Sequence, residues 1–312
     1  MVNFRFHLVS LTAVFLAVAI GIAVGATVVD QATVDALKSR LDGVRERVDR
    51  TDQENARLQR ELGGWTRFAQ EADNEAVAGR LRDVPVLMLA VHGIERDPVE
   101  ELSASLAAAE ARVQGTLWFT SKLKLEKPDD AAALAAILGS TSRTSDTLRR
   151  ALVTRLVAAL TGAEPAGLLA ALRSTAFLEL EAPAGPVPDV AALAGPDTRF
   201  VVVSAPGAEV PNEELAVPLA GQLARQAGSR VLAAEPGPRQ PEAGNQPAQR
   251  AVFVGQLRQD DQLAALLSTV DNVEDFRGRF AVVYALRDLA AGKVGHFGIG
   301  PGATRLVPET AA

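Results

Sequence analysis

Few side chains in this sequence could carry metal or nucleophile chemistry. It contains three histidines, two methionines and no cysteine. Thiolate zinc sites, iron–sulfur clusters, disulfides and cysteine nucleophiles are therefore excluded, and soft metal ions lack the sulfur and clustered imidazole ligands they prefer. We expect no cofactor and no resident metal.

Two places remain as candidate active sites. His92 follows an apolar run, at the position where open α/β folds place a ligand crevice, and Glu95 and Asp97 come soon after it. Asp271 and His296 could form an acid–base pair if the fold brings them together, but no nucleophile accompanies them. We interpret His92 as a loop residue, keep an enzyme using Asp271 and His296 as a minor alternative, and predict that the chain is not an enzyme.

A glycine-rich segment, Gly298 to Gly302, contains a G-x-G pattern. No strand–turn–helix pattern surrounds it, and Pro301 removes one backbone donor from a phosphate cradle, so we interpret it as a structural turn. Motifs of the P-loop, nucleophile-elbow and zinc-protease types do not occur in the sequence. A net charge of −6 further argues against nucleic acid as a partner.

The N-terminal segment is a candidate membrane span. No charged residue occurs from Leu8 to Val29, and a helix of that length crosses a hydrocarbon core of ~30 Å. A cleaved signal peptide is the alternative, because Val24 to Ala26 resembles a cleavage site, but the run exceeds the usual apolar region of roughly 7–15 residues. Arg5 before the span and Asp30 after it predict a single-pass cell-membrane protein with a cytoplasmic N-terminus.

Small residues recur every fourth position in this span. They are Ala13, Ala17, Gly21 and Gly25. This spacing places them on one helix face, where two backbones could approach closely, and predicts a dimerising anchor. The alternative is the general abundance of Ala and Gly in membrane spans.

A heptad pattern follows the span directly. Its a and d positions are Val34, Leu37, Leu41, Val44, Val48, Thr51, Asn55, Leu58, Leu62 and Trp65. β-branched residues or Leu at a, with Asn55 as one polar exception, favour a parallel two-stranded coiled coil. A single amphipathic helix packed on the globular part is the competing interpretation.

Flanking charges leave the partner of this coil open. In a parallel homodimer Arg47 could meet Asp52 of the other strand, whereas Arg40 would face Arg45. Self-association as a parallel dimer and a heteromeric coiled coil with another protein therefore both remain possible.

The remainder of the chain alternates apolar runs with helical patterns. We predict strands at 84–91, 115–120, 201–204, 230–233, 251–254 and 279–285, and helices capped by Asp97 and at 128–138, 145–160, after Pro165, 215–226 and 259–267. The predicted fold class is α/β: an N-terminal transmembrane helix and coiled coil followed by a Rossmann-like, mostly parallel α/β domain. The predicted domains are 1–29, 30–82 and 83–312.

Several segments together resemble the actinobacterial copper transport protein B (MctB) family. They are Phe4-Arg5-Phe6-His7 with the apolar run after it, the coiled coil, Ser268 to Val273 and Gly295 to Gly298. The resemblance implies an envelope-facing domain and a part in copper efflux or homeostasis, with the regulation of cell division and peptidoglycan hydrolases as an alternative. It supplies no catalytic residues.

The residues and the family name disagree about copper. His7 lies at the bilayer edge, His92 and His296 are far apart in sequence, and Met88 lies within a predicted strand, so we expect no dedicated copper site. One apolar span also has no polar face to line a pore. We therefore expect an extracytoplasmic scaffold that acts through its coiled coil, and an indirect route to copper efflux.

Overall fold

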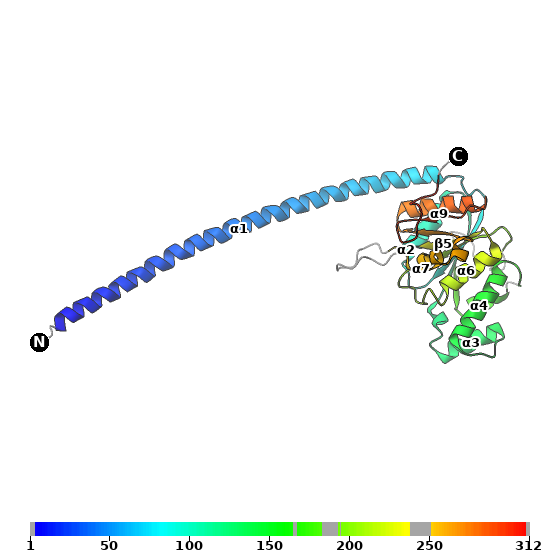
Figure 1. The fold of residues 1–312 in the computed structure, drawn as a ribbon, viewed down its shortest axis with the longest axis horizontal. Helices are drawn as coiled ribbons and strands as arrows, with labels where there is room; N and C mark the ends of the chain where they lie inside the picture. Colours follow the sequence, from blue (N-terminus) through cyan, green and yellow to red (C-terminus); the bar gives the residue numbers. More distant parts are fainter. Residues whose placement is uncertain (1–3, 165–166, 183–192, 194, 238–250, 310–312) are drawn as a thin grey trace. The chain divides into compact units, whose positions relative to one another are not determined.

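The structure is a computed structural model that describes residues 4–164, 167–182, 193, 195–237 and 251–309. Within the first helix, only the backbone is described at 26–33, 66 and 69–74. The chain divides into two compact units, Met1–Phe68 and Ala69–Ala312. Figure 1 shows the long helix of the first unit and the layered α/β fold of the second.

Helix α1 forms the described part of the first unit; it runs from Phe4 to Val77 over 74 residues, so that its C-terminal turns belong to the second unit. No proline precedes Pro85 in the sequence, so nothing interrupts the i to i−4 hydrogen bonds. The predicted span and the predicted heptad segment are therefore consecutive parts of a single helix. Within α1, Phe4–Gly25 is long and apolar enough to cross a membrane, with 22 residues and a mean hydropathy of 2.5.

The second unit is built on a seven-stranded sheet with the order β3-β2-β1-β4-β5-β6-β7. The strands are β1 Pro85–Val91, β2 Arg112–Phe119, β3 Leu178–Glu181, β4 Arg199–Val203, β5 Val231–Glu235, β6 Ser268–Asp271 and β7 His296–Phe297. All neighbouring pairs are parallel except β2 and β3. The predicted mostly parallel α/β domain is confirmed, and the chain reverses its direction of winding between β1 and β4.

Helices cover both faces of the sheet. They are α2 Arg96–Ala108, α3 Pro128–Leu138, α4 Ser145–Leu160, α5 Gly167–Ser174, α6 Ala216–Ala227, α7 Val252–Gln259, α8 Asp261–Ala264 and α9 Phe276–Leu289, with a 3-10 turn at Ser121–Lys124. One apolar core lies between the sheet and α3 to α7, and the other between the sheet and α2 and α9. Alternate residues of β1 enter the two cores: Leu87 and Leu89 face one, and Met88 and Ala90 the other.

The last turn of α1 belongs to the second core. Val77 is 0% exposed and Leu81, just beyond the helix, is 1% exposed. The Tyr284 hydroxyl of α9 donates a hydrogen bond to the carbonyl oxygen of Ala76 at 3.1 Å. Side chains that precede the sequence-based boundary at residue 83 are thus part of the α/β unit.

Two predicted strands are wrong, because both segments are helical. Residues 251–254 begin α7, and 279–285 lie inside α9. In α9 the buried side chains include consecutive positions from Ala281 to Leu286, so the sequence shows a short apolar run without helical periodicity. Three short strands, β3, β6 and β7, were not predicted. Helix α2 also begins at Arg96 rather than after Asp97, and its N-cap residue Glu95 makes no side-chain capping bond.

Candidate functional site

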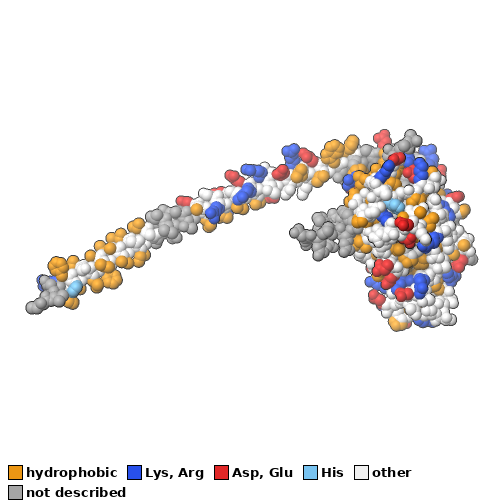
Figure 2. All heavy atoms as spheres, in the orientation of Figure 1, with side chains coloured by type: hydrophobic (Ala, Val, Ile, Leu, Met, Phe, Trp, Pro, Cys, Tyr) orange, Lys and Arg blue, Asp and Glu red, His pale blue; other side chains and the backbone are white. Residues whose placement is uncertain are grey.

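The heptad residues of α1 form a row of exposed apolar side chains along the helix. Val34 is 47% exposed, Leu41 50% and Leu62 65%. Leu37, Val44, Val48 and Leu58 are exposed to a similar degree. Figure 2 shows apolar side chains along the N-terminal stretch of α1 and charged side chains farther along it. An exposed apolar row of this kind is typical of helix faces that contact another helix or lipid.

The two glycines of the span, Gly21 and Gly25, lie on a different face of α1 from the heptad row. Because the helix is continuous, each residue turns about 100° around its axis. Gly21 and Leu37 are then about 160° apart around the axis, and the same holds for Gly25 and Leu41. Two parallel copies of α1 therefore cannot pair through these glycines and through the heptad row at once while the helix stays unbroken.

Asp271, at the end of β6, lies in a buried ionic network. Its Oδ2 accepts from Nη1 of Arg258 at 2.8 Å, and its Oδ1 accepts from the backbone N–H groups of Ile299 and Gly300 at 2.7 and 3.0 Å. The side chains of Arg258 and Asp271 are 3% and 2% exposed. A buried carboxylate with these three donors has a structural explanation and leaves little room for proton transfer to a substrate.

His296 joins the same network without touching Asp271. Its Nδ1 lies 2.9 Å from Oγ1 of Thr269, which also accepts from Nε of Arg258 at 2.7 Å. Burial lowers the pKa of His296 below its ordinary value of 6.5, and the nearby Arg258 cation lowers it further. The two residues of the minor enzyme hypothesis are near one another in the fold, but each is engaged by other groups. The geometry does not form the proposed acid–base pair.

The glycine-rich segment after β7 closes over Asp271. A Cβ atom on Gly298, whose φ is +129°, would come within 2.3 Å of the Asp271 carboxyl group. A Cβ on Gly300 would lie 2.7 Å from that of Ala251. These glycines allow the loop's N–H groups to reach an internal carboxylate, so the segment is a structural turn, as the sequence indicated.

Glu235, at the end of β5, fills the N-terminus of α7. Its carboxylate oxygens accept from the backbone N–H groups of Val252, Phe253 and Val254 at 2.8 to 2.9 Å, and the residue is 1% exposed. Burial raises the pKa of Glu235. The three hydrogen bonds lower this pKa, but they offset the effect of burial only in part, and the charge of Asp271 raises it further. The backbone donors that could hold an external anion are occupied by the chain's own side chain.

The space at the carboxyl ends of β1 and β4, where the winding reverses, is also filled by the chain itself. The carbonyl oxygen of His92 accepts from the N–H of Glu209 at 2.7 Å. A Cβ atom on Gly93, whose φ is +95°, would lie 2.5 Å from the carbonyl oxygen of Gly207. The loop after β4 therefore packs directly on the loop after β1, at the position where related folds hold a ligand.

A second polar cluster surrounds the Trp118 indole of β2. The His92 ring packs edge-on against it at 5.6 Å between centroids, and the Arg96 guanidinium lies 4.7 Å from its centroid. The indole Nε1–H donates to Oε2 of Glu181 at 2.7 Å. His92 Nε2 lies 3.3 Å from a carboxylate oxygen of Glu179, but without the angle of a hydrogen bond. His92 is thus a packed residue, as predicted, and the carboxylates that approach this cluster most closely are Glu179 and Glu181 of β3.

Comparison with known proteins gives the family. The family model described as "Copper transport outer membrane protein, MctB" matches residues 1–308. The chain belongs to the MctB family. Proteins called "Copper transporter MctB" from Mycobacterium bovis and from two strains of Mycobacterium tuberculosis are each 29% identical to it over 323 residues, which cover 97% of this chain and 98% of each relative.

The name of the MctB family raises the question of whether side chains of this chain could bind copper. Within the described part of the chain, no three His, Cys, Asp or Glu side chains gather as metal ligands. Met88 is 0% exposed inside β1, and Nδ1 of His296 is held by Thr269. These described side chains therefore do not present the thioether or imidazole cluster that copper prefers.

Proposed function

We propose that this chain is a single-pass, membrane-anchored scaffold of the cell envelope, which contributes to copper efflux or homeostasis by an indirect route. In this proposal residues 1–29 form the anchor with a cytoplasmic N-terminus, 30–82 form a coiled coil, and 83–312 form an extracytoplasmic α/β domain. Family membership supports the link to copper. The observation that carries the scaffold role is the uninterrupted helix α1 with its exposed heptad row.

The energetics of the exposed row favour pairing. Burying one Val or Leu side chain stabilises a complex by about 1.5–3 kcal/mol before the cost of association. Thr51 and Asn55 interrupt the row in its centre and weaken it. Several aliphatic pairs are therefore needed to hold two strands, and a membrane anchor helps by confining both strands to one surface.

Cross-linking in membranes tests the scaffold, because the sequence has no native cysteine. We expect Leu41→Cys and Leu58→Cys, both on the heptad row, to form cross-linked species with a bismaleimide. Glu46→Cys and Gln53→Cys, on the opposite side of the heptad, are matched controls and should react several-fold less. Equal reaction at all four positions would reject the coil.

The size and composition of the cross-linked species identify the partner. A product of twice the chain mass indicates the parallel homodimer. A larger heterogeneous product, identified by mass spectrometry, would indicate a heteromeric coil with an envelope protein. Recovery of a division protein or a peptidoglycan hydrolase would favour the alternative role in cell-wall regulation over the copper role.

A calorimetric titration tests the indirect route. We expect the full chain in detergent to bind neither Cu(I) nor Cu(II) more tightly than micromolar, because the described residues present no ligand cluster. A tighter stoichiometric site, abolished by His92→Ala or His296→Ala, would show that the chain handles copper directly.

A further inference from the structure

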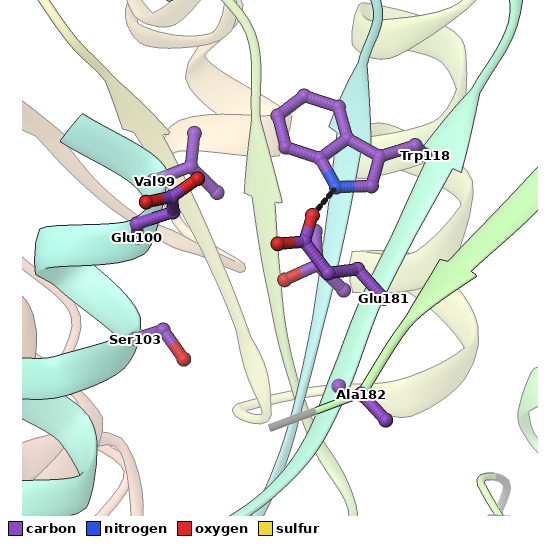
Figure 3. A pocket seen from close by; sticks show the side chains of 8 residues that line it. Val99, Glu100, Ser103, Trp118, Glu181 and Ala182 are labelled. Carbon is purple, nitrogen blue, oxygen red and sulfur yellow. Dashed lines mark hydrogen bonds between the residues drawn. The ribbon is translucent and has the colours of Figure 1, made fainter. Parts of the chain in front are cut away.

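A pocket lies between α2 and the β2–β3 edge of the sheet (Figure 3). Its volume is about 220 Å³. The lining residues are Val99, Glu100, Ser103, Gly115, Thr116, Trp118, Glu181 and Ala182. The space is large enough for several water molecules or one short alkyl chain with a polar head.

A backbone irregularity opens this pocket. The pairing of β1 with β2 shifts register between Val86 and Leu87, which leaves Gln114 unpaired as a bulge. Gly115, with φ +139°, follows, and a Cβ atom there would lie 2.8 Å from the carbonyl oxygen of Glu181. The glycine thus lets β3 approach while leaving the floor of the pocket without a side chain.

Two carboxylates face the pocket from opposite walls. Figure 3 shows the Glu100 side chain reaching from α2, and the Glu181 side chain from β3, into the space between helix and sheet. Within the described part of the chain, Glu100 has no ion-pair or hydrogen-bond partner. Glu181 is held in place through Oε2 by Trp118 and by Arg96 at 3.3 Å, so its Oε1 remains available.

Carboxylates outnumber cations around the pocket. Arg96 is shared between Glu181 and Glu179, at 3.3 and 3.9 Å, and Glu100 is an exposed carboxylate on the facing wall. Val99, Ala182 and the indole edge supply apolar wall, and the Ser103 hydroxyl adds one hydrogen-bonding group. Arg96 itself shows that a guanidinium is compatible with these surroundings, since it stacks over Trp118 and pairs with Glu181.

We propose that this pocket binds a monocationic group on a short alkyl stem, either an alkylammonium or an alkylguanidinium. The cation lies between Glu100 and Oε1 of Glu181, and the stem lies against Val99 and Ala182. This ligand chemistry has two sources, a free amine or guanidine and the side chain of a lysine or arginine in another protein. The site is independent of the coil and of copper.

The indole reports on the pocket directly. The chain contains two tryptophans, Trp65 and Trp118, so the full-length Trp65→Phe chain labelled with 5-fluorotryptophan gives a single ¹⁹F signal from Trp118. Butylammonium and butylguanidinium are the probes, and butanol and butyrate are the neutral and anionic controls at the same ionic strength. We expect a saturable shift with the two cations only, because a cation on Glu181 alters the acceptor of the indole N–H.

Two variants and one control locate the binding. Glu100→Gln should weaken cation binding by about tenfold, the loss expected for one charge-assisted interaction. Ser103→Leu should abolish binding by filling the pocket from the surface of α2. Glu95→Gln, an exposed acidic residue just before the same helix and outside the lining set, should change affinity less than about twofold.

The same titrations can overturn the proposal. A shift produced equally by butanol, a Glu100→Gln chain that binds the cations like its parent, or no saturable shift at concentrations of ~100 mM would each reject the cation site. A peptide with one arginine flanked by glycines distinguishes the sources. Binding about tenfold tighter than butylguanidinium assigns a protein side chain, and equal or weaker binding assigns a free solute.

Discussion

Helix α1 and the α/β unit differ in how far their side chains are buried and bonded within the chain. In the α/β unit the polar groups at the carboxyl edge of the sheet, such as Asp271 and Glu235, are bonded within the chain. In α1 the apolar heptad side chains, such as Leu37 and Leu62, are more than half exposed. The polar groups of the unit are therefore satisfied within it, whereas the heptad side chains of α1 are exposed, as the proposed coiled coil requires.

This difference predicts where function depends on other molecules. A buried charged residue in the α/β unit, such as Asp271, stabilises the fold, so its replacement should lower the stability of this unit. In the proposed coiled coil, a heptad residue of α1 contributes only when a partner covers it, so its loss should act on assembly. The following experiments separate the two kinds of effect, from the largest to the smallest.

Asp271→Ala should cause the largest loss. It leaves the buried Arg258 without its counter-ion and removes the acceptor for two backbone N–H groups. We expect the free energy of unfolding of the α/β unit to fall by about 3–5 kcal/mol. Chemical unfolding followed by Trp118 fluorescence in the Trp65→Phe chain measures it.

A surface pair provides the matched control for this experiment. Arg82 and Glu110 form an ion pair at 2.6 Å, with side chains 69% and 45% exposed. Arg82→Ala should therefore reduce the free energy of unfolding far less than Asp271→Ala does, because solvent screens this pair. If Asp271→Ala lowers the free energy of unfolding no more than Arg82→Ala does, the buried ionic network does not stabilise the α/β unit, and the contrast with α1 is wrong.

Single cysteine substitutions in the membrane span should show which face of α1 contacts a second copy of the helix. Counting heptads backward from Val34 places Leu16 on the row, whereas Gly21 lies on the small-residue face. If the coil pairs two parallel chains, Leu16→Cys should cross-link several-fold more than Gly21→Cys in membranes. The reverse result would assign the anchor's dimer to Ala13, Ala17, Gly21 and Gly25 and would require another partner for the coil.

Asn55→Val tests the register of the heptad row. Two Asn55 side chains in a parallel dimer can hydrogen-bond across the interface, at a cost in stability relative to an aliphatic pair. The variant should melt higher, by on the order of 5 °C for each 1 kcal/mol gained, and should add trimers or shifted registers in analytical ultracentrifugation of residues 30–78. A lower melting temperature would mean that Asn55 faces solvent.

Acid should destabilise the α/β unit slightly through His296. Because its pKa is lowered in the folded state, the unfolded chain takes up a proton as the pH falls below about 6.5 while the folded chain does not. Stability is therefore lost toward low pH. The difference in unfolding free energy between pH 7.5 and 5.5 should shrink in His296→Asn and stay unchanged in His7→Gln.

The sequence predicts elements whose periodicity is local and misses those defined by distant contacts. Helices 128–138 and 145–160 were predicted with their observed bounds, because apolar residues recur there at helical spacing. In contrast, α7 begins where Glu235, far away in the sequence, accepts its first N–H groups. Nothing in residues 251–254 signals that carboxylate.

The candidate sites show the same limit. The pairing of Asp271 with Arg258 could not be predicted, because an arginine in a helical pattern is normally interpreted as solvent-exposed. The pocket beside Trp118 depends on β3, which is too short to give a strand pattern of its own. The heptad row, by contrast, is visible in the sequence because it needs no tertiary context.

Glu235 can be regarded as a tethered ligand of α7. Its carboxylate is delivered by β5 to three backbone N–H groups, at an effective concentration far above that of any free anion in solution. Phosphate or carboxylate metabolites therefore cannot compete for this helix terminus at ordinary concentrations. In this respect the α/β unit is insulated from changes in the anion content of its compartment.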